Sequence, residues 1–262
     1  MQIYIAIIII AVIILIVFIP LWLKNRWTAR KRDRTIIDLY DCDFQTGDLI
    51  LFSGTAKLSF LLTNVFGDEF SHVGIVYRNR DGKLFIIEAV PTYALKWDHH
   101  DGVKITPLYE RILTYNGYLC WRKLRSHPHI VERFDNLVER LSNEHKLYKF
   151  TDPDWKSLFA FYMQHSDHDT IHNAYVVHCA LFATKCLMFV GIVPANKYKY
   201  RYFIRPQHYA EFVSGDHTEF ASGGKTSTYD QLIEIKRDET QRRNLLDMLN
   251  GNITYDGHTT AE

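Results

Sequence analysis

Three residues of this chain have the side chains and the positions that nucleophilic catalysis requires. His72 begins the strand-like segment HVGIVY, Glu88 ends the strand-like segment KLFIIE, and Cys179 begins an apolar, helix-like segment. A cysteine becomes an effective nucleophile when a neighbouring base takes its proton, and a third group can hold that base in the right orientation. The trio therefore contains the parts of a cysteine hydrolase or acyltransferase.

The spacing of His72 and Glu88 predicts that the two side chains share one face of a β-hairpin. Residues 72–77 and 83–88 are apolar, strand-like runs joined by the turn sequence Arg-Asn-Arg-Asp-Gly. If the turn is centred on Arg80, His72 lies directly opposite Glu88, with Cβ atoms about 5 Å apart. The carboxylate would then fix the imidazole tautomer and stabilise its cationic form. The alternative for a strand histidine is a satisfied, half-buried side chain without a chemical role.

The position of Cys179 at the start of a helix distinguishes it from the other cysteines, Cys42, Cys120 and Cys186. Unpaired N–H groups and the positive end of the helix dipole lower the pKa of a thiol there, and the same amides can hold an oxyanion. Cys186 lies mid-helix, where a buried and inert thiol is expected. The cysteines form no CxxC pair, which favours free thiols in a reducing compartment.

The elements that must position this trio are short strands and helices that alternate along the chain. Residues 47–52, 102–105 and 118–123 are further predicted strands, whereas 58–66, 131–141, 179–190, 206–213 and 230–249 are predicted helices, and one more helix is expected to begin at 152–154. This pattern predicts an α+β fold in which a small antiparallel sheet packs on the helix that carries Cys179.

The order of these motifs resembles the circularly permuted NlpC/P60 branch of the papain-like superfamily. The motifs are GDLILF, SHVGIVY, FIIEA, the helix led by Cys179, and IRPQHYAEF, which together span approximately residues 41–213. That group includes permuted bacterial amidases, proteins of large DNA viruses and, more distantly, the lecithin:retinol acyltransferase group. Its histidine precedes its cysteine, the reverse of ordinary papain-like chains.

The resemblance implies roles for the trio and a fold. Cys179 would be the nucleophile, His72 the general base and Glu88 the third, orienting residue, in a permuted papain-like fold with a small sheet or partial barrel packed on the cysteine helix. One feature departs from the pattern: Ala180-Leu181 follows the cysteine where many permuted members have Ser-Glu. The substrates of the family therefore cannot be transferred to this chain.

The N-terminal segment Ile3–Leu23 predicts a transmembrane helix. Its 21 residues carry no charge, and at ~1.5 Å per residue they span about 32 Å, the thickness of a bilayer core. The alternative, a cleaved signal peptide, would have a basic N-terminus and a small-residue cleavage site. Six basic residues follow the segment: Lys24, Arg26, Arg30, Lys31, Arg32 and Arg34. Positive charge on this side predicts a cytosolic main domain, whereas glycosylation of the sequon at Asn252 would indicate a lumenal one.

The composition sets limits on domains and partners. Outside the basic stretch, 25 basic residues stand against 29 acidic ones, which argues against nucleic-acid binding. We expect an anchor (residues 1–23), a basic linker (24–40), a catalytic domain (41–213) and a polar connector with a C-terminal helix (214–262). The composition is rich in Ile, Lys and Tyr and is compatible with a viral membrane protein. The oligomeric state is left open.

The sequence favours a membrane-anchored cysteine hydrolase that cleaves an amide or ester through an acyl-enzyme. The substrate is expected to be peptide-like or a lipid acyl group. The alternatives are a thiol enzyme of the lipid acyltransferase or phospholipase kind, and a catalytically silent, membrane-tethered binding protein. No cofactor or metal is expected, although His165, His168 and His172 have helical spacing that could present them to a metal ion; their polar surroundings favour a solvated helix end.

Overall fold

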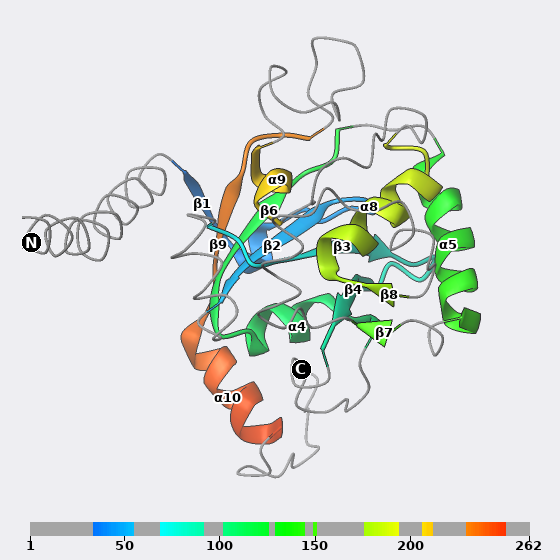
Figure 1. Ribbon diagram of the computed structural model, residues 1–262. Helices are drawn as coiled ribbons and strands as arrows, with labels where there is room; N and C mark the ends of the chain where they lie inside the picture. The colour runs from blue at the N-terminus through cyan, green and yellow to red at the C-terminus, as the bar shows by residue number, and fades with distance from the viewer. Residues whose placement is uncertain are drawn as a thin grey trace, which may run out of the picture.

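A seven-stranded mixed sheet lies at the centre of the computed structural model (Figure 1). The structure describes residues 34–54, 69–91, 102–125, 129–144, 149–150, 176–193, 206–211 and 229–249. The strands are β1 (Thr35–Asp38), β2 (Leu49–Gly54), β3 (His72–Arg78), β4 (Leu84–Val90), β5 (Gly102–Pro107), β6 (Gly117–Arg122) and β9 (Ile233–Lys236), in the spatial order β1-β9-β6-β2-β3-β4-β5. Neighbouring strands are antiparallel except β1 and β9, which are parallel. The predicted α+β class is confirmed, with a larger and mixed sheet.

Helices cover both faces of this sheet. They are α4 (Leu108–Thr114), α5 (Ile130–Glu144), α8 (Cys179–Phe189), α9 (Pro206–Glu211) and α10 (Glu239–Leu249), with a short 3-10 turn, η2 (Leu39–Asp41). A small parallel pair, β7 (Lys149–Phe150) and β8 (Val176–Val177), forms a second sheet, in which β7 contacts β5 of the main sheet. Figure 1 shows α5 and α8 beside each other, and α4 with α10 on another side of the sheet.

Two hydrophobic clusters, one on each face, explain why the central strands are apolar throughout. Odd-numbered residues of β2 and β3, such as Leu51 and Val73, pack with α5, α8 and α9. Even-numbered residues, such as Phe52 and Val76, pack with α4 and η2. A strand that is covered on both faces loses the usual alternation of apolar and polar residues. The helix that carries Cys179 thus packs on β3 and β4, as predicted.

The C-terminal region differs from its prediction. A single helix was expected over 230–249, but Ile233–Lys236 forms β9, and only Glu239–Leu249 is helical. Ile235 alternates with charged neighbours and is buried between the sheet and α10, so a two-residue period decides the structure there. β1 lies in the predicted linker, and β9 in the predicted connector region, so the sheet draws strands from both sides of 41–213.

The other predicted strands and the helices at 131–141, 179–190 and 206–213 match observed elements to within a few residues at each end. The predicted helices at 58–66 and from 152–154, and the anchor Ile3–Leu23, lie outside the described residues. Within the described ranges, no helix combines the length and the apolar character needed to cross a membrane.

Candidate active site

His72 and Glu88 meet at the core of the candidate site. His72 Nε2 lies 2.6 Å from Glu88 Oε2, a short charge-assisted contact. The Glu88 side chain is fully buried, and 13% of the His72 side chain is exposed. The predicted pairing of imidazole and carboxylate is therefore present in the structure.

The register that produces this contact differs from the predicted one. Arg78 pairs with Leu84, so the turn comprises residues 79–83 and the register is shifted by two residues. Glu88 is therefore a diagonal neighbour of His72 and not its direct partner. Because side chains alternate with a period of two, an even shift keeps both on the same face. Diagonal neighbours in antiparallel strands remain within reach of long side chains.

Gly74 provides the space for this diagonal contact. A Cβ atom at Gly74 would lie 2.5 Å from Ile86 Cδ1 and 3.4 Å from Glu88 Cβ. The side chains of β4 thus lie over the glycine and approach the β3 backbone closely, which a larger residue would prevent.

Arg111 completes the charged cluster on this face. Arg111 Nε lies 2.5 Å from Glu88 Oε1, and Arg111 Nη2 lies 3.1 Å from Glu88 Oε2. The guanidinium also stacks over the Phe52 and Tyr115 rings, at 4.8 and 5.3 Å from their centroids. Burial raises the pKa of Glu88, but Arg111 and His72 outweigh it and lower the pKa to about 2. Glu88 is therefore a permanent carboxylate.

No local sequence pattern indicates Arg111 as part of the site. It lies on α4, a seven-residue helix that was not predicted. Leu108 and Ile112 have the i, i+4 spacing of a buried helix face, which is the signal that could have revealed the helix. An arginine among such residues is usually exposed, however, and only the packing of α4 on β4 buries this one.

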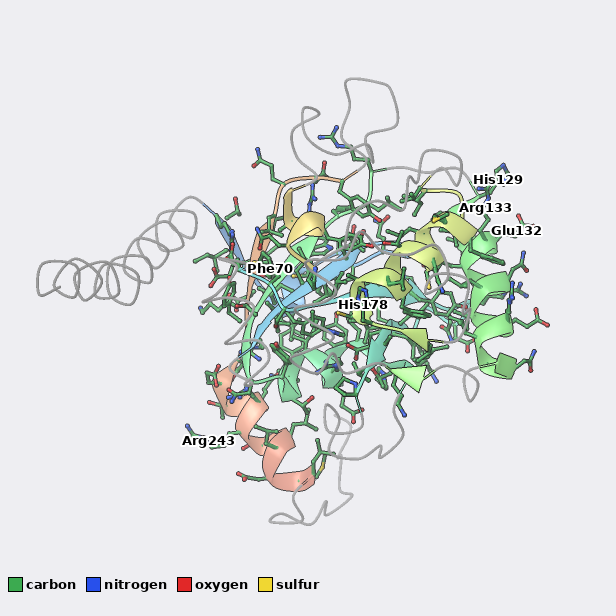
Figure 2. All side chains as sticks on the ribbon, viewed as in Figure 1. Phe70, His129, Glu132, Arg133, His178 and Arg243 are labelled. Carbon is green, nitrogen blue, oxygen red and sulfur yellow. The ribbon has the colours of Figure 1, made fainter. Side chains whose placement is uncertain are left out.

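Cys179 begins α8, as predicted. Its Sγ lies 3.9 Å from the carbonyl oxygen of Ser71, the residue directly before His72. His178 is the N-cap residue, and its ring Nδ1 accepts a hydrogen bond from the Leu181 N–H at 3.4 Å. Figure 2 labels His178 where α8 begins. The structure therefore brings the third member of the trio to the end of β3 that carries His72.

The electrostatics of the trio favour an ion pair at neutral pH. Burial raises the pKa of Cys179, but the charge of His72 and hydrogen bonds from His178 and His72 lower it to about 6. Burial lowers the pKa of His72, but Cys179 and Glu88 raise it to about 9. Nε2 of His72 bonds Glu88, so Nδ1 is the nitrogen left to act on Cys179. Between these two pKa values the thiolate and the imidazolium coexist.

The other three cysteines have the opposite electrostatics. All are free and buried. Burial raises the pKa of Cys42 to about 12, and burial likewise raises that of Cys120 to about 12. Burial also raises the pKa of the Cys186 thiol well above its ordinary value. The predicted difference between Cys179 and Cys186 agrees with this pattern. His165, His168 and His172 lie outside the described residues, within which no group of three metal-ligating side chains occurs.

Comparisons with known proteins find weak structural similarity and no related curated sequence. The chain matches no protein-family model, and a search of curated proteins finds no match. Among solved structures it is similar to the metalloprotein yiiX of Escherichia coli O157:H7. That likeness has a TM-score of 0.37 and 16% sequence identity, and it covers 74% of this chain and 97% of the other. A similarity at this level carries no inference about function.

Proposed function

We propose that this protein is a cysteine hydrolase that cleaves an amide or ester bond through an acyl-enzyme. The observation that supports it best is the convergence of Cys179 and Glu88 on His72, with Cys179 the one cysteine whose pKa is lowered. Strongly perturbed, mutually coupled ionisable groups are typical of catalytic sites. A purely structural cysteine has no need of such a partner.

The first step is attack by the Cys179 thiolate on the carbonyl carbon of the substrate. A carbon–sulfur bond forms and the carbonyl oxygen becomes an oxyanion. The first N–H groups of α8, those of Cys179 and Ala180, have no partner within the helix, as in any first turn, and are the donors available for it. The imidazolium of His72 then donates its proton to the leaving amine or alcohol, and the bond to that group breaks.

The second step releases the acyl group. Neutral His72 takes a proton from water, the water oxygen attacks the thioester carbonyl, and the Cys179 thiolate leaves as the acid product forms. Glu88 keeps the imidazole oriented and stabilises its cation, and Arg111 keeps Glu88 ionised and fixed. The site thus returns to its starting ion pair.

The proposal extends to the fold and the location. The adjacency of β3 and β4, α8 packed upon them and the order His, Glu, Cys along the chain support a permuted NlpC/P60 papain-like fold. Ile3–Leu23 is the proposed anchor, with the domain on the cytosolic side. The proposed substrates are peptide-like amides and lipid acyl esters.

Alkylation by a small thiol reagent tests the proposal. At pH 7 we expect iodoacetamide to label Cys179 far faster than the other cysteines, as measured by peptide mass spectrometry over a time course. His72→Ala should slow this labelling strongly, whereas Cys186→Ser, a matched change later in the same helix, should leave it intact. Equal labelling of Cys179 and Cys186, or labelling that does not depend on His72, would refute the proposed site.

A second measurement separates hydrolysis from its alternatives. Incubation with an activated acyl ester should add the acyl mass to Cys179, and this mass should disappear with release of the free acid. Transfer of the acyl group to an added amine or lipid in place of water would indicate an acyltransferase. If iodoacetamide labels Cys179 but no amide or ester substrate acylates it, the result would support a catalytically silent binding protein.

A further inference from the structure

The short helix α9 contacts the segment that leads into β3. Gln207 is buried, and its Oε1 accepts hydrogen bonds from the N–H groups of Glu69 at 2.8 Å and Phe70 at 3.3 Å. Phe70 is labelled in Figure 2. These residues precede β3, so the sheet does not pair their N–H groups. The next N–H, that of Ser71, donates to Phe52 O at 2.9 Å. Gln207 therefore holds the backbone immediately before His72.

The same helix also contacts the start of α8. The Tyr209 hydroxyl donates to the Ala180 carbonyl oxygen at 3.0 Å and shares a hydrogen bond with Thr184 Oγ1. Ala180 directly follows Cys179, and Tyr209 is almost fully buried. Two side chains, two positions apart on α9, thus reach the two segments that carry the nucleophile and the base.

A third contact fixes α9 to the sheet. Arg122 of β6 is fully buried and donates from Nη1 to the Tyr209 carbonyl oxygen at 2.5 Å. The Glu69 side chain is also held, by an ion pair with Arg34 and a hydrogen bond from Tyr118. Hydrogen bonds thus join α9 to β6, to the segment before β3 and to the start of α8.

We propose that α9 is a positioning clamp that sets the distance between Cys179 and His72. Gln207 fixes the backbone on the His72 side, Tyr209 fixes it on the Cys179 side, and the Cys179–Ser71 contact lies between them. The hydrogen bonds of Gln207 and Tyr209 to these segments reach backbone atoms, so the two side chains act through the backbone. This inference rests on the proposed function, because a defined thiol–imidazole separation matters only if the pair reacts.

The test compares Gln207→Met with Gln207→Glu. Methionine keeps the volume and removes the acceptor, whereas glutamate keeps an acceptor for both N–H groups. The measured quantity is the rate of Cys179 alkylation by iodoacetamide as a function of pH. We expect Gln207→Met to raise the pH midpoint of Cys179 alkylation toward the ordinary thiol pKa of about 8.5. It should slow labelling at pH 7 on the order of tenfold, since small misplacements of reacting groups are costly. Burial favours the protonated carboxyl of Gln207→Glu, which has the shape of the amide and still accepts from both N–H groups, so this variant should stay close to the wild type. Gln45→Met, a matched change at an exposed position, should also stay close to the wild type.

The outcomes separate this inference from the proposed function. If wild-type Cys179 titrates in the ordinary thiol range, the proposed function fails. Suppose that alkylation of wild-type Cys179 has a midpoint below the ordinary thiol range and depends on His72. If the alkylation rate of Gln207→Met then has the same pH profile as the wild type, only the clamp is refuted. If Gln207→Met does not fold, as judged by near-UV circular dichroism, Tyr209→Phe decides: it removes one hydroxyl, and a wild-type profile for it overturns the clamp.

Discussion

Replacing Glu88 with glutamine should reveal the charge balance that holds the site together. Glu88 is fully buried between two cationic groups, with Arg111 on one side and His72 on the other. The amide keeps the shape of the side chain but removes its charge, so the Arg111 guanidinium remains buried without a carboxylate. The change therefore separates electrostatics from packing.

The expected cost follows from the pKa of Glu88. It falls from the ordinary 4.5 to about 2, and at ~1.4 kcal/mol per pH unit this corresponds to about 3 kcal/mol of stability at neutral pH. Removal of one partner of a buried ion pair costs ~3–5 kcal/mol in measured cases. We therefore expect Glu88→Gln to lower the free energy of unfolding by about 3 kcal/mol or more. Because the pKa is depressed, this contribution is present above pH 4.5 and disappears as the pH falls through about 2.

Urea unfolding of a double-mutant cycle measures this contribution. The cycle comprises Glu88→Gln, Arg111→Met and the double variant, each followed by far-UV circular dichroism at pH 7. We expect the double variant to lose less stability than the sum of the two single variants, because it leaves no buried charge unpaired. His72 should also lose its stabilising partner in the double variant, so the midpoint of Cys179 alkylation should rise. Strict additivity of the two single losses would refute the reasoning.

Three further predictions follow from the same geometry. Turnover of an ester substrate should be bell-shaped in pH, rising near 6 as Cys179 ionises and falling near 9 as His72 loses its proton; a profile with a single limb above pH 8 would contradict the ion pair. Gly74→Ala should destabilise the fold by ~1–3 kcal/mol in thermal unfolding, since the added Cβ would lie 2.5 Å from Ile86 Cδ1. Ile86→Val in the same chain removes that atom and should recover part of the lost stability. If it recovers none, the clash is not the cause. A chain ending at residue 228 lacks β9 and exposes the edge of β6, so it should aggregate, or unfold at a lower urea concentration than a chain ending at residue 249, which keeps β9. Equal stability of the two chains would contradict a structural role for β9.

Much of the candidate site follows from local sequence patterns. The period of two in a strand places His72 and Glu88 on one face, and this conclusion survives the register shift because the shift is even. The start of α8 at Cys179 follows from the apolar run that it opens. The strand at Ile233–Lys236 was missed because its four residues are adjacent to a longer helical pattern.

Only the tertiary structure decides what surrounds the trio. Arg111 reaches Glu88 from a helix that is distant in sequence, and Gln207 reaches Glu69 across 138 positions. Side-chain period and helix ends are properties of a few consecutive residues, so the sequence by itself determined that His72 and Glu88 share a face and that a helix begins at Cys179. Which distant cation or amide packs against them depends on how whole elements fill the space over the sheet. That packing, which no local pattern encodes, keeps Glu88 charged and holds the Cys179 and His72 segments together.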